Sequence, residues 1–141
     1  MVHAGADAYH ALMHSASEPA LARLLSRAAS DPDVLAVILF GSQARGEVLP
    51  TSDVDVCLVL VPGFDPDRAF ERKLSYSGAF DVDLALFHEL PLHVRSRVLR
   101  EGRVLFVRDE DALYELAIRT ARAFDDFRHI HRQYLDEIAR G

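Results

Sequence analysis

The chain has 141 residues, of which 50% are hydrophobic and 27% are charged, and this balance favours one compact domain over a disordered chain. The net charge of −6 argues against direct binding of nucleic acid, which requires a cationic surface. We expect no membrane association, because no segment is long and apolar enough to span a bilayer and the N-terminus lacks a signal-peptide pattern. Cys57 is the lone cysteine, which excludes an intrachain disulfide and fits a reducing, cytoplasmic location.

The chain begins with weakly patterned residues and then becomes regular. Residues 1–16 are expected to form an N-terminal arm, and residues 17–141 a single domain. Ser17 is a suitable N-cap, and Pro19 is suited to a first helical turn. The spacing of the following leucines predicts a helix that ends near Ser30.

Strand-like and helix-like segments alternate along the rest of the chain. The predicted strands cover residues 34–40, 53–61, 80–87 and 103–107. Predicted helices begin at Asp65 or Asp67, at Pro91 and near Asp109, and a break is expected at Gly78. The order predicts an α/β (α+β) fold, in which a small mixed sheet of about four to five strands is flanked by helices and followed by a long C-terminal helix.

The long C-terminal helix carries an apolar stripe. The stripe consists of Leu113, Leu116, Ala117, Ala121, Phe124, Phe127, Leu135 and Ile138. Its second half also mixes Ile130 and Tyr134 with arginines. The simpler interpretation is core contact on one side and a solvated face on the other, whereas an exposed aromatic patch would favour a protein interface.

Two aspartates alternate at the start of the second predicted strand. Asp53 and Asp55 project from the same face, because side chains alternate along a strand. Two like charges about 5 Å apart repel by about 3 kcal/mol at an effective dielectric near 20. A nearby cation, protonation of one carboxyl or a divalent metal must offset this repulsion. Asp81 and Asp83 repeat the pattern, and one of them joins the cluster if the two strands are neighbours.

A candidate phosphate site precedes these carboxylates. Gly41 lets the backbone approach a ligand closely, and Ser42 adds a hydroxyl donor. Arg45 offers a planar guanidinium suited to phosphate. Each residue alone has an ordinary structural explanation, but phosphate-binding groups and metal-binding carboxylates in this order are the parts that phosphoryl or nucleotidyl transfer requires.

The segment GSQARG at residues 41–46, followed after five residues by SDVD at 52–55, resembles the G-S-x-A-R-G-x5-S-D-x-D signature of the minimal nucleotidyltransferases. These proteins belong to the DNA polymerase β-like nucleotidyltransferase superfamily. The resemblance extends over roughly residues 34–140. It places the third carboxylate of the family on Asp83, with Asp81 as the alternative.

The resemblance implies a reaction in which an acceptor hydroxyl attacks the α-phosphate of ATP and pyrophosphate leaves, with two Mg²⁺ ions as cofactors. The implied catalytic and metal-binding residues are Asp53, Asp55 and Asp83, and the implied nucleotide-binding residues are Gly41, Ser42, Arg45 and Ser52. Asp83 would ligate the second metal or act as the base. Gly41 and Ser42 would hold the β- and γ-phosphates.

The sequence does not by itself identify the molecule that accepts the AMP group. The resemblance favours an antitoxin that transfers AMP to a tyrosine of a cognate HEPN-domain ribonuclease toxin, because the chain has no obvious domain for binding another acceptor. The alternatives are transfer to a small hydroxylated molecule such as an antibiotic, and a non-catalytic antitoxin that masks its toxin by binding. A homo- or hetero-oligomer fits each of them.

Overall fold

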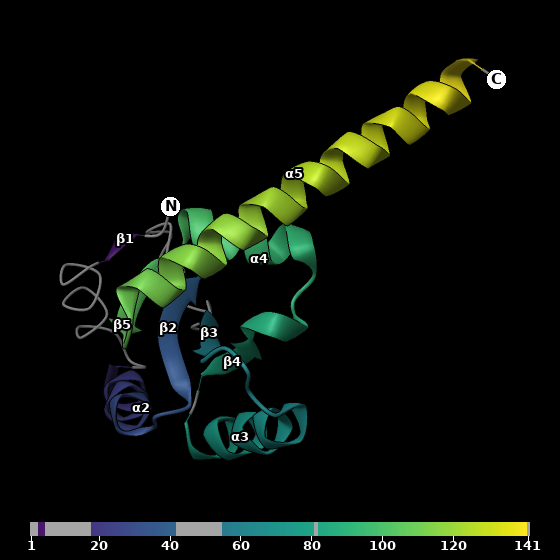
Figure 1. The fold of residues 1–141 in the computed structure, drawn as a ribbon. Coiled ribbons are helices and arrows are strands. Elements are labelled where there is room, and N and C mark those ends of the chain that lie inside the picture. The colour runs from purple at the N-terminus through teal and green to yellow at the C-terminus, as the bar shows by residue number, and fades with distance from the viewer. Residues whose placement is uncertain (1–2, 5–17, 42–54, 81, 141) are drawn as a thin grey trace.

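The protein is a mixed α/β fold, as the sequence predicted (Figure 1), and the computed structural model describes residues 3–4, 18–41, 55–80 and 82–140. The strands are β1 (His3–Ala4), β2 (Val34–Phe40), β3 (Asp55–Leu60), β4 (Asp83–Leu86) and β5 (Arg103–Val107). The helices are α2 (Glu18–Ser30), α3 (Pro66–Ala79), the short 3-10 helix η1 (Phe87–Glu89), α4 (Leu92–Glu101) and α5 (Glu110–Arg140). The strands form one sheet in the order β1-β5-β2-β3-β4.

Strand β2 lies at the centre of the sheet and pairs antiparallel with both β3 and β5. The outer pairs, β3 with β4 and β1 with β5, are parallel. Helices α2 and α3 pack on one face of the sheet, and α4 and α5 pack on the other. This three-layer arrangement explains why β2 is a continuous apolar run, since both of its faces are covered.

Two predicted boundaries are wrong, and one strand is unpredicted. Helix α3 runs through Gly78 to Ala79, so the predicted strand 80–87 shortens to β4. Glycine costs only about 1 kcal/mol in a helix, and the packing of the preceding turn, which contains Tyr76, outweighs this cost. Strand β1 is two residues long, too short to produce a periodic pattern, and it depends on β5 for its pairing.

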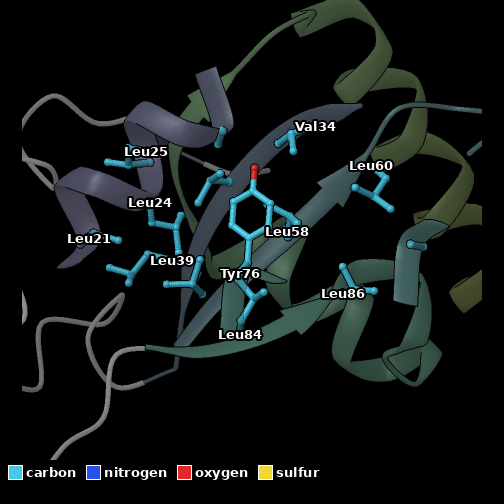
Figure 2. Packing of buried hydrophobic residues seen from close by; sticks show 14 residues of the cluster. Leu21, Leu24, Leu25, Val34, Leu39, Leu58, Leu60, Tyr76, Leu84 and Leu86 are labelled. Atoms are coloured by element: carbon cyan, nitrogen blue, oxygen red, sulfur yellow. The ribbon is translucent and has the colours of Figure 1, made fainter. Parts of the chain in front are cut away.

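The core between the sheet and helices α2 and α3 is built around one tyrosine. Tyr76 is fully buried, and its ring lies among leucines from α2 and from the strands (Figure 2). Its neighbours in this cluster include Leu21, Leu24, Leu39, Leu58 and Leu86. A buried tyrosine requires a partner for its hydroxyl group.

The Tyr76 hydroxyl donates a hydrogen bond of 3.0 Å to Oδ2 of Asp31, in the turn after α2. Arg72 donates to the same oxygen at 3.0 Å and to Oδ2 of Asp33 at 2.8 Å. Burial, together with the hydrogen bond to Asp31, raises the pKa of Tyr76 above its usual range, so the hydroxyl stays protonated. The guanidinium of Arg27 lies 4.2 Å from the centre of the Tyr76 ring. This network joins α3 to the turn between α2 and β2.

A second cluster fills the space between the sheet and helices α4 and α5. It includes Ile38 and Cys57 from the strands, Val98 and Leu99 from α4, and Leu113 from α5. Ser96 of α4 is buried beside them. Burial raises the pKa of the Cys57 thiol, so this cysteine is an inert core residue.

Helix α5 is covered only along its first half, and its second half extends away from the rest of the molecule (Figure 1). Leu113 and Ala117 are buried, whereas Phe127 is 55% exposed and Tyr134 is 60% exposed. The expectation of core contact along the whole stripe is therefore wrong for its second half. Within the described part of the chain, no helix combines the length and the apolar character needed to cross a membrane.

Replacing Tyr76 with phenylalanine tests the role of the buried hydroxyl. We expect Tyr76→Phe to lower the free energy of unfolding by about 1 kcal/mol, because one hydrogen bond is lost while Asp31 keeps its bond to Arg72. The exposed Tyr134→Phe is the matched control and should leave stability unchanged. Urea unfolding measures both changes, and equal midpoints for the two variants would contradict this role.

Candidate active site

Two predicted site residues, Asp55 and Asp83, lie side by side at the edge of the sheet. They are register partners on the parallel strands β3 and β4. Neighbouring strands are about 4.8 Å apart, and paired residues point to the same face. Asp55 is half-buried and Asp83 is exposed. The third predicted strand therefore does lie beside the second, as the clustering of their carboxylates requires.

Gly41 lies directly beside Asp55. Phe40, the last residue of β2, pairs with Asp55, so the chain leaves β2 next to the carboxylate. Gly41 has a φ of +80°, which residues with a side chain rarely adopt. A Cβ atom built at this position would also overlap Oδ2 of Asp55. The sequence predicted a glycine that leaves room for a ligand, and the structure adds that the glycine leaves room for Asp55.

The carboxylates lie on the sheet face that α4 and α5 cover farther along. Asp55, Cys57 and Val59 alternate on this face, and Cys57 and Val59 are buried in the second cluster. Val56 and Leu58 point to the opposite face, toward α2 and α3. Strand β3 is thus apolar on both faces except at its first residue.

The other predicted site residues lie outside the described part of the chain. These are Ser42, Arg45, Ser52 and Asp53, together with Asp81, the alternative to Asp83. Their roles in phosphate, nucleotide and metal binding stay predictions.

Asp55 and Asp83 supply a donor set that fits a hard divalent cation. Carboxylate oxygens are the ligands that Mg²⁺ prefers, and Mg²⁺ usually takes one or two of them together with water and substrate phosphates. Among the described residues, no group of three or more histidine, cysteine, aspartate or glutamate side chains is gathered that could hold a metal by itself.

The chain is similar in sequence to a known protein. A Methanocaldococcus jannaschii protein, named as a candidate protein adenylyltransferase, is 32% identical over 73 residues, which cover 52% of this chain and 56% of that protein. The chain thus matches about half the length of this relative.

Two solved structures share the fold. A chain from a toxin–antitoxin crystal structure with AMP-PNP has a TM-score of 0.61 and 21% identity, with 85% of this chain and 96% of that chain covered. A chain from the complex of a tri-AMPylated Shewanella oneidensis HEPN toxin with an MNT antitoxin has a TM-score of 0.56 and 21% identity, with 86% of this chain and 95% of that chain covered.

The family model described as "Polymerase beta, Nucleotidyltransferase" matches residues 23–111. This is more than half of the chain and includes Gly41, Asp55 and Asp83. The chain therefore belongs to the polymerase β nucleotidyltransferase family.

Proposed function

We propose that this protein is an antitoxin that transfers AMP from ATP to a tyrosine hydroxyl of a cognate HEPN ribonuclease toxin and releases pyrophosphate. The observation that carries the proposal is the pairing of Asp55 with Asp83 beside Gly41, in a chain of the nucleotidyltransferase family. The names of the relatives support the acceptor, since one is a candidate protein adenylyltransferase and another is an antitoxin bound to an AMPylated HEPN toxin. The single buried cysteine fits a reaction in the cytoplasm.

Some of the site residues bind the nucleotide, and another accepts a proton. Gly41 and Ser42 hold the β- and γ-phosphates, and Arg45 and Ser52 support the nucleotide. The tyrosine oxygen attacks the α-phosphorus, the bond to the bridging oxygen breaks, and pyrophosphate leaves with the released electron pair. Asp83 is exposed at the strand edge, where it can accept the tyrosine proton.

Asp53 and Asp55 are the proposed metal ligands, with Asp83 as the third. When bound, two Mg²⁺ ions would neutralise charge on the triphosphate and on the leaving pyrophosphate. The same charge would offset the repulsion between the two neighbouring carboxylates of β3 and β4. The site therefore gains its favourable electrostatics when metal and nucleotide bind together.

The exposed half of α5 supports a protein as the acceptor rather than a small molecule. Its exposed apolar residues are Phe127, Ile130, Tyr134, Leu135 and Ile138. Arginines and acidic residues alternate along the same segment. Aromatic residues and arginine are enriched in protein interfaces, and an apolar patch of this extent is unusual on a free protein surface. We assign this surface, called the α5 stripe, to the toxin.

Transfer of AMP is tested with the toxin, ATP and Mg²⁺. We expect the toxin mass to rise by one or more AMP units in intact-mass spectrometry, and its ribonuclease activity to fall. Asp55→Asn combined with Asp83→Asn should slow the mass change by about 100-fold or more, since the metal ligands and the proton acceptor are lost. Asp111→Asn, on the exposed first turn of α5, is the control and should transfer AMP normally.

The same variants separate catalysis from masking. If the toxin is inhibited equally by the wild type and by Asp55→Asn with Asp83→Asn, the protein acts by binding, and the catalytic proposal is wrong. If the wild type adds no AMP to the toxin but adds AMP to a small hydroxylated compound, the acceptor has been assigned wrongly.

Gly41 and Gly63 form a matched pair for testing the site. Both have φ near +80°, so alanine at either position should cost about 1–2 kcal/mol of stability. Only at position 41 would the new Cβ overlap Asp55, whereas nothing lies within 4 Å of the position at residue 63. We expect Gly41→Ala to abolish AMP transfer and Gly63→Ala to keep it. Equal transfer by the two variants would show that Gly41 has no special relation to the carboxylate.

The α5 stripe is tested by its affinity for the toxin. We expect Tyr134→Asp to weaken toxin binding at least about ten-fold, because a charge is placed at the centre of an apolar interface. His129→Asp introduces the same charge on another side of the helix and is the control. Isothermal titration calorimetry measures the affinity, and ATP binding checks that the domain remains folded. Unchanged affinity of Tyr134→Asp would remove the α5 stripe from the interface.

A further inference from the structure

A cavity of about 450 Å³ is lined by residues of α4, α5 and η1, by the last residues of β3 and by residues 62–64 after it, at the end of β3 that is far from Asp55. Leu35, Val59 and Phe87 contribute buried apolar surface to its lining. Its volume is within the range of about 300–1,000 Å³ that is typical of small-molecule sites.

The cavity is separate from the carboxylate pair, although both lie on the same face of the sheet. Val59 lines the cavity and is four residues after Asp55 along β3. At 3.3 Å per residue, the two positions are about 13 Å apart. A ligand in the cavity would therefore lie behind the reacting atoms, between the sheet and the two helices.

The charge of the lining is opposite to that of the chain. Arg95 from α4 and Arg119 from α5 line the cavity, and none of the described lining residues is acidic. The whole chain carries a net charge of −6. An acid-free cavity with two guanidinium groups in such a chain favours an anionic ligand.

One of these arginines has an unsatisfied donor. Nε of Arg95 is buried and has no hydrogen-bond partner among the described residues. Leaving a buried charged donor without a partner is costly, and such groups are rare in folded proteins. A carboxylate or phosphate oxygen in the cavity is the partner that a guanidinium prefers.

The remaining polar groups of the lining do not oppose an anion. The His88 ring lies 4.3 Å from the Phe64 ring, and both residues line the cavity. Burial lowers the pKa of His88, with Glu89 acting in the opposite direction, so the imidazole is a neutral polar group at pH 7. The Thr120 hydroxyl donates to the carbonyl oxygen of Leu116 at 2.8 Å. Aromatic and aliphatic surface thus surrounds the two cationic groups.

We propose that this cavity binds a small organic anion, with its apolar body against Phe64 and Phe87 and its single carboxylate or phosphate group on Arg95 and Arg119. The site is additional to the nucleotidyl-transfer site, and the proposal does not depend on the identity of the acceptor. A ligand there touches both helices that pack on this face of the sheet, including the covered half of α5.

The test compares three probes of one size: 1-naphthoate, 1-naphthyl phosphate and the neutral 1-naphthalenemethanol. We expect at least one of the anions to bind with a stoichiometry of one in isothermal titration calorimetry, and about ten-fold or more tighter than the alcohol. In ¹H–¹⁵N spectra the Arg95 Nε–H resonance should shift on binding. The preferred anion identifies the head group as carboxylate or phosphate.

Variants of the lining provide the controls. Arg95→Leu should weaken binding of the anion about ten-fold or more, whereas Arg97→Leu, on the exposed side of the same helix, should not change it. If Arg95→Leu does not fold, Arg119→Leu tests the same charge from the rim of the cavity.

Four results would overturn the proposal. The first is equal affinity of the protein for the anions and the alcohol, and the second is a lack of saturable binding of the anions at millimolar concentration. The third is that the shifts in the ¹H–¹⁵N spectra are confined to residues of the α5 stripe. The fourth is displacement of the bound anion by saturating AMP-PNP. The last result would make the cavity part of the nucleotide site.

Discussion

The antiparallel register between β2 and β3 determines which side of the sheet every residue of β3 faces. Phe40 pairs with Asp55, and the residues that follow Asp55 alternate between the two cores. A slip of one residue would turn Asp55 toward the leucines around Tyr76 and would expose apolar side chains in exchange. Burying a carboxylate there without a partner costs several kcal/mol. The two cores therefore hold Asp55 at the sheet edge, beside Gly41.

The face of the sheet under α4 and α5 carries two environments of opposite charge. The carboxylates of Asp55 and Asp83 lie at one end, and the guanidinium groups of Arg95 and Arg119 line the cavity toward the other. Asp55 and Val59, which lines the cavity, are about 13 Å apart along β3. The two charged groups therefore belong to separate regions of this face, and each can attract its own ligand. The apolar middle of β3 keeps them apart.

Local patterns predicted the elements well, whereas contacts between distant segments could not be predicted. Strand 34–40 is an apolar run between Pro32 and Gly41, strand 103–107 follows Gly102, and the structure reproduces both. The role of Asp55 could be predicted from the alternation of side chains along one strand. The position of Asp83 beside it could be predicted only by knowing which strands are neighbours. The contact between Gly41 and Asp55 depends on cross-strand register, and the Arg95 cavity depends on the packing of α4 against α5. Neither leaves a periodic signal in the sequence.

The shape of α5 has a consequence for the lifetime of the protein. Beyond Phe124 every residue of the described helix is exposed, so about four turns depend on their own backbone hydrogen bonds. An isolated helix of this length is marginally stable in water, so these turns open easily to proteases while the surface is uncovered. A partner protein bound to this surface would close this route of degradation. Turnover of the protein would then be coupled to the amount of that partner, independently of any transfer of AMP.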